Sequence, residues 1–263
     1  MAIKTKWMIG TLLALSVAHA TPALADLKMG VAAEPYPPFT SKDASGKWVG
    51  WEVDVMNALC ADIGEKCSIE EVAWDGIIPA LQAKKFDAIM SSMAINEKRK
   101  QTINFSNMYY NSAPVLIGAK NGDKEISPDH LKGKSLGVQV STIHATYAKK
   151  YFEPKGAVLK TYETQDQVNA DLAAGRLDYI IADGVSLEDF LKSDQGNCCE
   201  MKGAVPYDVD IFGVGVGFGL RKDDAALQAK LNKGIADLAQ AGTFAKITET
   251  WKLTGKLILP QAK

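Results

Sequence analysis

Two kinds of segment alternate along the chain when its hydrophobic and polar positions are compared. Short apolar runs bounded by small or polar residues are typical of buried strands. Longer segments with apolar residues three or four positions apart are typical of helices with one buried face. The predicted strands are 27–32, 68–73, 88–91, 136–140, 158–162, 179–182 and the glycine-rich run 212–220, and the predicted helices are 51–63, 76–84, 142–152, 165–174, 185–191 and 225–241. This alternation indicates an α/β fold.

The order of the predicted elements repeats once. Each half runs strand, helix, strand, helix, strand, and a similar short sequence precedes the last strand, K-K-F-D at 84–87 and A-G-R-L-D at 174–178. Two similar lobes joined by extended crossovers enclose a cleft, and hinge closure around a ligand is the expected motion. The predicted lobes are residues 26–112 with 212–263, and residues 113–211.

The first 25 residues have the pattern of a secretory signal peptide. Lys4 and Lys6 provide the positive start, residues 8–17 a short apolar run, and A-L-A at 23–25 a cleavage signal. No cysteine follows the cleavage site to carry a lipid anchor, and no later segment approaches the roughly 20 apolar residues of a membrane helix. We therefore expect export. Removing 25 of the 263 residues leaves a mature chain of 238 that begins at Asp26.

Charge and cysteine content narrow the classes of function. Without the two signal-peptide lysines, 28 basic residues face 31 acidic ones, and a net charge of −3 argues against binding to nucleic acid. Four cysteines in an exported chain indicate disulfides, and no zinc site is expected because the remaining histidines lie far from them in sequence. The turn between Cys60 and Cys67 favours a bridge there. The adjacent Cys198 and Cys199 either form a strained vicinal bridge or stay separate thiols without a role.

The segment 87–99 combines features that suit a small carboxylate. A predicted strand ends in Ser91 and Ser92, and Arg99 follows at the start of a helix. Ligands of α/β sheets sit beyond the carboxyl ends of the strands, where free backbone N–H groups and a bidentate guanidinium bind anions well. Serine and arginine are also common at solvated strand ends, so this segment alone does not establish a site.

Three further elements end at the same expected cleft. Glu34 and Tyr36 follow the first strand in a proline-stiffened loop, Trp74 follows the second, and Asp183 follows the last strand of the second half. An acid beside aromatic rings suits a cationic or planar group, and Asp183 suits an ammonium group. Each of these residues also has an explanation that needs no ligand. Tyr36 and Trp74 fit core aromatic residues, and Glu34 fits an exposed loop acid. Asp183, like Asp75, fits a cap of the helix that follows it. The coincidence of these elements at strand ends favours an amino-acid ligand with a polar or cationic side chain.

Several motifs together carry a resemblance to a known family. They are Y-P-P-F at 36–39, G-W-E-V-D at 50–54, W-D-G-I-I-P-A-L at 74–81, D-A-I-M-S-S-M at 87–93, E-K-R at 97–99, A-A-G-R-L-D at 173–178 and F-G-V-G-V-G-F-G-L-R-K at 212–222. Across the mature chain, the sequence resembles the periplasmic solute-binding proteins of polar amino-acid and opine ABC importers, nearest to the lysine/arginine/ornithine- and histidine-binding ones. The resemblance implies a two-lobed type II binding fold, a periplasmic location, a membrane permease as partner, and neither cofactor nor catalysis. The sequence leaves the oligomeric state open, and a monomer is the default expectation.

The resemblance also implies a role for individual residues. Tyr36 and Trp74 would sandwich the ligand side chain, Arg99 would hold the α-carboxylate, and Asp183 with Ser92 would hold the α-amino group. Cys60 and Cys67 match the single disulfide of the family, whereas Cys198 and Cys199 have no counterpart. The candidate ligand-binding residues are Glu34, Tyr36, Trp74, Ser91, Ser92, Ala94, Arg99, Thr142, His144 and Asp183.

Three departures from the family pattern concern the ligand. Ala94 replaces a serine that basic-amino-acid binders usually carry, Ile143 stands beside Thr142 where many have a threonine, and Glu34 lies two residues before Tyr36 rather than three. Each lost hydroxyl removes about 1 kcal/mol of hydrogen bonding and leaves space. We therefore hypothesise that an opine, an amino acid substituted on its α-nitrogen, is tolerated.

Two other classes of function remain as alternatives. An enzyme of the same fold, such as a cyclohexadienyl or arogenate dehydratase, would need a general acid, for which Asp183 or Glu34 could serve. A receptor's sensing domain is disfavoured because no membrane helix is predicted.

Overall fold

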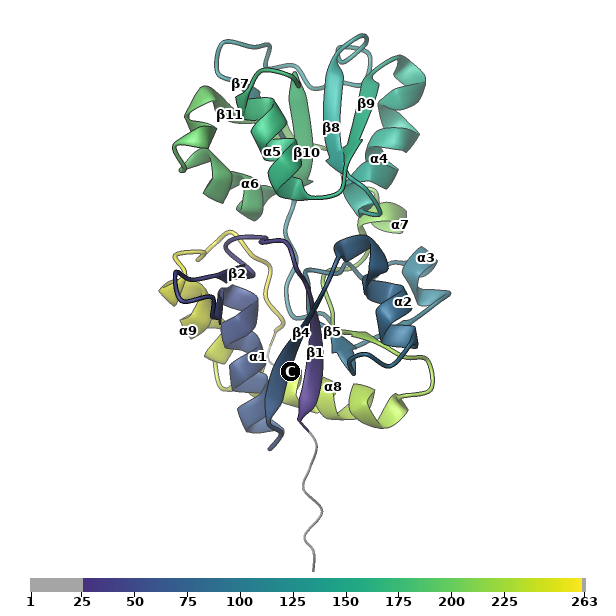
Figure 1. The fold of residues 1–263 in the computed structure, drawn as a ribbon, viewed down its shortest axis with the longest axis vertical. Coiled ribbons are helices and arrows are strands. Elements are labelled where there is room, and N and C mark those ends of the chain that lie inside the picture. The colour runs from purple at the N-terminus through teal and green to yellow at the C-terminus, as the bar shows by residue number, and fades with distance from the viewer. Residues whose placement is uncertain (1–25, 262–263) are drawn as a thin grey trace, which may run out of the picture.

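The computed structural model describes residues 26–261, and the expected signal peptide over 1–25 lies outside the described residues. Two lobes, each an α/β layered unit with its own five-stranded sheet, lie one above the other (Figure 1). The predicted two-lobed α/β fold is confirmed. Among the described residues, no helix combines the length and the apolar character needed to cross a membrane.

The first lobe is built around a mixed sheet. Its strand order is β4 (Cys67–Val72), β1 (Leu27–Ala32), β5 (Ala88–Ile89), β12 (Gly219–Leu220) and β6 (Asn104–Phe105). The strand β1 pairs in parallel with β4 and β5, and β12 is antiparallel to its neighbours. The helices are α1 (Trp51–Asp62), α2 (Ile77–Gln82), α3 (Glu97–Lys100), α8 (Ala225–Gln240) and α9 (Thr243–Thr250), and a small hairpin joins β2 (Ser41–Lys42) to β3 (Trp48–Val49).

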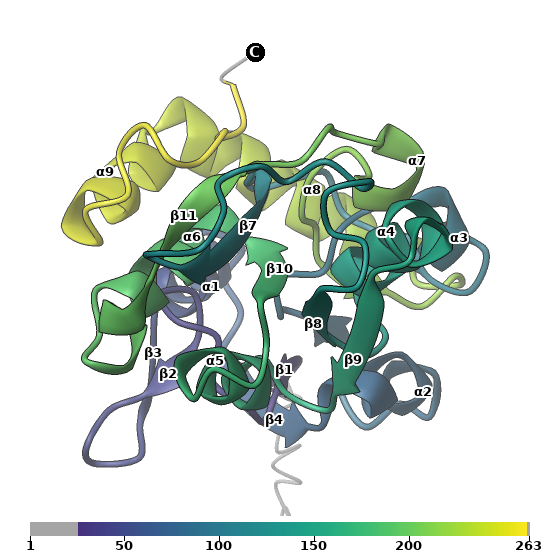
Figure 2. The same cartoon turned by 90° about the horizontal axis from the view of Figure 1, so that it is seen from above.

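The second lobe repeats this layered arrangement. Its sheet has the order β11 (Cys199–Ala204), β7 (Pro114–Ala119), β10 (Tyr179–Asp183), β8 (Ser135–Gln139) and β9 (Val158–Tyr162). Its helices are α4 (Ile143–Tyr151), α5 (Gln165–Ala173), α6 (Gly184–Leu191) and α7 (Val209–Phe212). Two apolar clusters fill the two faces of the sheet, one under α4 and α7 and the other under α5 and α6, and Figure 2 shows these helix pairs on opposite sides.

The first lobe has the same two-faced core. One cluster joins the sheet to α1, α8 and α9 through large buried side chains such as Trp51 and Phe244, and the other joins it to α2 through Ile77 and Leu81. Continuous apolar runs such as β1, whose residues other than Lys28 are buried, occur because both faces of the sheet are covered.

Most predicted elements agree with the structure to within two residues at each end, but the strand 212–220 is wrong. Only Gly219–Leu220 is a strand, and Phe212 ends α7 with its side chain in the core of the second lobe. Between them Gly213 has a φ of 77°, and a Cβ there would lie 2.0 Å from the carbonyl oxygen of Ile95. Since only glycine fits this approach, the run bends instead of extending.

Two segments cross between the lobes, 106–113 and 213–218. They lie side by side, because the N–H of Val216 donates to the carbonyl of Tyr110 at 2.7 Å and the N–H of Tyr109 donates to the carbonyl of Val216 at 2.9 Å. Paired crossovers of this kind form a hinge about which two rigid lobes can close.

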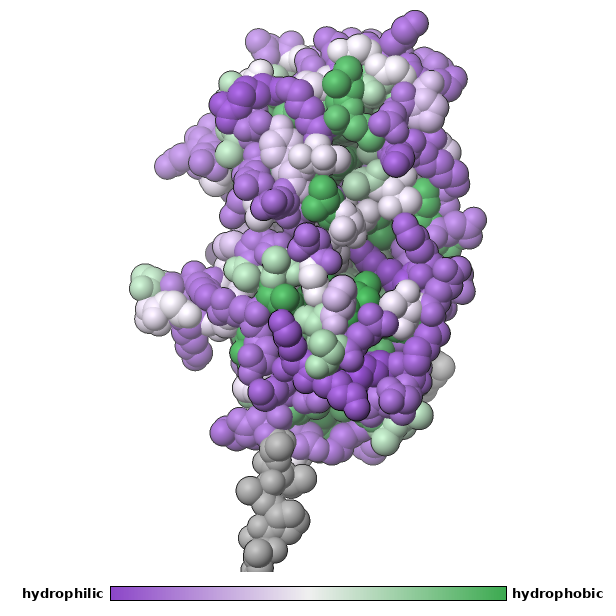
Figure 3. Space-filling model, turned by 45° about the vertical axis from the view of Figure 1, so that its right-hand side comes forward, coloured by the Kyte–Doolittle hydropathy of each residue, from purple (hydrophilic) through white to green (hydrophobic). Residues whose placement is uncertain are grey.

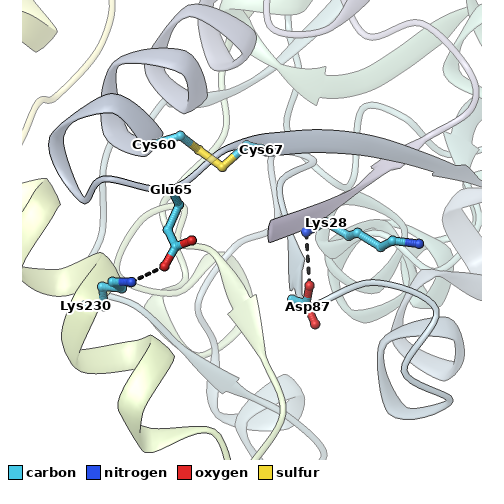
Figure 4. Close-up of a disulfide and its surroundings, with 6 residues drawn as sticks. All are labelled: Lys28, Cys60, Glu65, Cys67, Asp87 and Lys230. Carbon is cyan, nitrogen blue, oxygen red and sulfur yellow. Dashed lines mark hydrogen bonds and ion pairs between the residues drawn. A yellow bond between two sulfur atoms is a disulfide. The ribbon is translucent and has the colours of Figure 1, made fainter. Parts of the chain in front are cut away.

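Two disulfides are present. The bridge between Cys60 and Cys67, which the sequence favours, ties the end of α1 to the start of β4 (Figure 4). Between these cysteines Glu65 pairs with Lys230 of α8, so the same corner is also tied to that helix. Cys198 and Cys199 form a vicinal bridge, the first of the two alternatives, at the junction of a short 3-10 helix (Gln195–Cys198) and β11.

Candidate functional site

A cavity lies where the two lobes meet, at the level where the molecular surface narrows (Figure 3). Both lobes contribute to this interlobe cavity, and its volume is about 50 Å³. It is lined by Ala32, Glu34, Pro35, Tyr36, Trp74, Ser91, Ser92, Arg99, Gln139, Thr142, Ile143, His144, Gln165 and Asp183. Of the ten candidate residues, all but Ala94 therefore line one cavity.

The two serines after β5 present opposite hydrogen-bonding character. The hydroxyl oxygen of Ser91 accepts the N–H of Ala32 at 3.1 Å, which leaves its hydrogen available to donate. Ser92 donates both its N–H and its hydroxyl to the carboxylate of Glu52, at 2.9 Å and 3.0 Å, which leaves only oxygen lone pairs. Neighbouring residues thus provide one donor and one acceptor.

Arg99 brings a half-buried positive charge to the cavity. Asn96 caps α3 by accepting the N–H of Arg99, which fixes the start of the side chain. Within residues 26–261 the guanidinium donates only to backbone carbonyls, that of Ala94 at 3.1 Å and that of Ser141 at 3.5 Å, and it lies 5.4 Å from the Trp74 ring. Burial lowers the pKa of Arg99 to about 10, and nearby Asp183 opposes the shift. The cation therefore lacks a directly bonded anion.

Asp183 faces Arg99 from the other lobe. It is the residue before α6, but its carboxylate makes no capping hydrogen bond, so the capping alternative is wrong. One carboxylate oxygen accepts the Tyr36 hydroxyl at 2.8 Å, and the other lies 3.7 Å from Nε2 of His144. Burial and the charge of Asp183 raise the pKa of Tyr36, so the phenol stays protonated and donates across the cleft.

His144 is a buried neutral neighbour of this carboxylate. Its Nε2 atom is buried without a hydrogen-bond partner in the described chain, since 3.7 Å exceeds hydrogen-bonding range. Burial lowers the pKa of His144, Asp183 raises it, and Arg99 lowers it further. An unsatisfied polar atom in the cavity wall is a place where a ligand or water would bind.

Glu34 joins the two lobes on the side of the cavity where Trp74 lies. Its carboxylate accepts the N–H of Trp74 and the Nε2 hydrogen of Gln139, both at 3.2 Å, so it is not a free loop acid. The indole nitrogen of Trp74 is itself buried without a partner in the described residues. The expected cap at Asp75 is wrong, because Asp75 lies inside the short 3-10 helix Trp74–Gly76 and the helix that follows, α2, has no side-chain cap.

Two candidate residues, Thr142 and Ala94, make their main contacts with the protein backbone. Thr142 caps α4, since its hydroxyl accepts the N–H of Ala145 and donates to the carbonyl of Gln139. Ala94 lies outside the cavity lining, and its side chain is 3% exposed where it pairs with Val216. The argument that alanine at this position makes room for a substituted ligand is therefore wrong.

Three polar residues of the site were not predicted from the sequence. Gln139 and Gln165 line the cavity, and Glu52 bonds to Ser92 in its wall. Gln139 ends β8 and Gln165 begins α5, positions that the rule of strand ends and helix starts could have found. Glu52 accepts the hydroxyl of Ser92 and is fully buried. The sequence of its helix gives no sign that this acid is buried rather than exposed to solvent.

Comparisons with known proteins agree with this geometry. Residues 27–254 match the family of bacterial extracellular solute-binding proteins, family 3. The histidine-binding periplasmic protein of Salmonella typhimurium is 39% identical, with 92% of this chain and 94% of that protein covered. The lysine/arginine/ornithine-binding periplasmic protein of Escherichia coli is 42% identical, with 82% and 84% covered.

A solved structure gives the same result for the fold. An ancestral arginine-binding protein bound to arginine superposes with a TM-score of 0.79 at 30% identity, over 86% of this chain and 97% of that one. These relatives are named as binding proteins, which supports a non-enzymatic role. The chain belongs to the bacterial extracellular solute-binding proteins, family 3.

Proposed function

We propose that this protein captures a basic L-α-amino acid outside the cytoplasmic membrane and delivers it to the permease of an ABC importer. The observation that carries the proposal is the pair Arg99 and Asp183. Within the described residues Arg99 donates only to backbone carbonyls and Asp183 accepts only from a neutral group, the Tyr36 hydroxyl, so neither has a directly bonded opposite charge, and both line one cavity from opposite lobes. An α-amino acid carries the two complementary charges one carbon apart.

The hydrogen-bonding character of the serines supports one orientation of the ligand. The α-carboxylate lies against Arg99 and the free hydrogen of Ser91, and the α-ammonium lies against Asp183 and the lone pairs of Ser92. The side chain then extends between Tyr36 and Trp74 toward Glu34, where a cationic end finds aromatic faces and a carboxylate.

Ligand entry requires the lobes to open. A cavity of about 50 Å³ is well below the roughly 150 Å³ that holds one benzene molecule. The hydrogen bond from Tyr36 to Asp183 also occupies the place proposed for the ammonium group. Binding therefore follows a population shift, in which the ligand enters an open form and favours closure because it contacts both lobes.

The names of the relatives support the ligand class, since they include histidine-, lysine/arginine/ornithine- and arginine-binding proteins. A location in the periplasm is proposed on the same ground and on the signal-peptide pattern. An opine remains a ligand to test, but Ala94 no longer favours it because its side chain lies outside the cavity.

Calorimetric titration tests the proposal. The protein is unfolded and refolded to remove carried-over ligand, then titrated with arginine, lysine, ornithine, histidine and an octopine-type opine, with glutamine and γ-aminobutyrate as controls. We expect tight binding of at least one basic amino acid and its loss in Asp183→Asn. Failure of all the basic amino acids to bind would overturn the proposal. Incubation with arogenate or prephenate is expected to yield no product.

A further inference from the structure

Glu52 is a buried carboxylate that does not line the interlobe cavity but bonds to Ser92, which does. It is the second residue of α1 and is 0% exposed. Its oxygens accept hydrogen bonds from three neutral donors, the N–H of Ser92, the hydroxyl of Ser92 and the hydroxyl of Tyr109. Burial raises the pKa of Glu52, and the hydrogen bonds from Tyr109 and Ser92 oppose that shift.

The chemistry of a carboxylate sets the direction of all three hydrogen bonds. An ionised carboxylate can only accept, so Tyr109 and Ser92 must donate. Ser92 has a φ of 50°, a left-handed conformation that its two bonds to Glu52 help to hold. Both of its polar hydrogens then point away from the interlobe cavity, and its hydroxyl oxygen offers lone pairs only.

We propose that Glu52 is a positioning residue that fixes Ser92 as a hydrogen-bond acceptor and thereby makes the cavity select ligands with an α-ammonium group. The inference rests on the proposed function and deepens it, because it names the group on the ligand that Glu52 selects. Ser91 shows the contrast: its hydroxyl accepts from Ala32, so its hydrogen remains free for an anion.

Glutamine at position 52 should reverse the polarity of Ser92. An amide has one oxygen and one NH₂ group where the carboxylate has two oxygens. All groups are satisfied when the amide oxygen accepts from the Ser92 N–H and from Tyr109, and the NH₂ donates to the Ser92 hydroxyl oxygen. The opposite amide orientation leaves the buried Tyr109 hydrogen without an acceptor, which is unfavourable. In the favoured orientation the Ser92 hydrogen turns toward the ammonium.

The experiment compares the binding of two ligands to the wild type and to one variant. Affinities for L-arginine, and for arginine without its α-amino group, are measured on wild type and Glu52→Gln. We expect Glu52→Gln to lose about 10- to 100-fold in affinity for L-arginine, as for a hydrogen bond to a charged group, and less than about 3-fold for the des-amino analogue. Glu65→Gln removes a carboxylate of the same lobe that pairs with Lys230, and is the matched control.

A double-mutant cycle with Ser92→Ala provides a second readout. If Glu52 acts through Ser92, the double variant binds L-arginine no more weakly than the weaker single variant. Additive losses, equal losses for both ligands, or unchanged affinity in Glu52→Gln would each overturn the inference while leaving the proposed function standing. Absence of amino-acid binding by the wild type would instead overturn the proposed function.

Tyr109→Phe keeps the inference testable if Glu52→Gln does not fold. It removes one donor to Glu52 and leaves both contacts with Ser92. The groups that act on the charge of Glu52 are Tyr109, Tyr110 and Asp183, and loss of the Tyr109 donor favours its protonation. We expect Tyr109→Phe to lose L-arginine affinity at a higher pH than wild type, with the des-amino analogue unaffected. Identical pH profiles would overturn the inference.

Discussion

Replacing Arg99 by methionine should change the stability of the free protein and its affinity for ligand in opposite directions. The guanidinium is half-buried against two backbone carbonyls and the Trp74 ring, and no carboxylate of the described residues is directly bonded to it. Its pKa falls from 12.5 to about 10. At about 1.4 kcal/mol per pKa unit this fall corresponds to about 3.5 kcal/mol. Because Arg99 keeps part of its surface in solvent, which screens the charge, we take a cost of at most about 3 kcal/mol.

Methionine removes that cost and keeps an unbranched side chain to pack against Trp74. Two hydrogen bonds and the contact with the ring are lost at the same time, which offsets about 1 to 2 kcal/mol. The net gain of about 1 kcal/mol should raise the melting temperature of the ligand-free protein by about 2–4 °C. Arginine affinity should fall by about 2–5 kcal/mol, or roughly 30- to 5000-fold, because a buried ion pair loses one partner.

Circular dichroism on refolded, ligand-free protein measures the first effect, and calorimetric titration the second. Arg176→Met is the control, since Arg176 is an exposed residue paired with Asp171 and away from the cavity, and it should change neither quantity appreciably. A lower melting temperature in Arg99→Met, or an arginine affinity within about threefold of wild type, would refute the reasoning.

Three other predictions follow from particular contacts. Tyr36→Phe removes the hydroxyl that joins the lobes through Asp183, so the radius of gyration without ligand should increase in X-ray scattering and stay unchanged with saturating ligand; an equal radius would contradict this. Because burial lowers the pKa of His144, its protonation should weaken arginine binding only below about pH 6.5, and His144→Gln should abolish that dependence; parallel profiles would exclude this role. Joint replacement of Cys60 and Cys67 by serine should lower the free energy of unfolding in urea by about 2.5 kcal/mol, and an unchanged midpoint would contradict the loop-entropy estimate.

The predicted elements agree with the structure where periodicity alone determines them. The run 27–32 and the helix from Trp51 are apolar in the pattern that their buried faces require. The strand predicted over 212–220 failed because its backbone depends on a distant residue, the carbonyl of Ile95 against Gly213. An apolar, glycine-rich run has the composition of a strand whether or not another segment approaches it.

In the candidate site too, residues that follow from local sequence were predicted and residues that depend on distant contacts were not. Ser91, Ser92 and Asp183 were predicted because ligands sit beyond the carboxyl ends of strands, and here a strand of each lobe, β5 and β10, ends at the cavity between the lobes. Ala94 was predicted from the family resemblance, because it stands where basic-amino-acid binders usually carry a serine, but Ser92 turns the chain through a left-handed conformation and Ala94 packs beside Val216. Glu52 could not be predicted, because only the tertiary structure places Ser92 and Tyr109 around its carboxylate.

The lobe to which each cavity residue belongs, and the contacts that it makes, indicate which part of a ligand drives closure. Asp183 already has a donor, the Tyr36 hydroxyl, so an ammonium group replaces one hydrogen bond with a stronger ion pair. Arg99 has only carbonyl oxygens, so a carboxylate adds an anion where none is bonded. A ligand shifts a conformational equilibrium only by the difference between its affinities for the two states. Arg99, Ser91 and Ser92 belong to the first lobe and can hold the ligand whether the lobes are open or closed, whereas Asp183 of the second lobe reaches it only on closure. In the proposed function the contact between the α-ammonium and Asp183 therefore contributes most to holding the lobes closed.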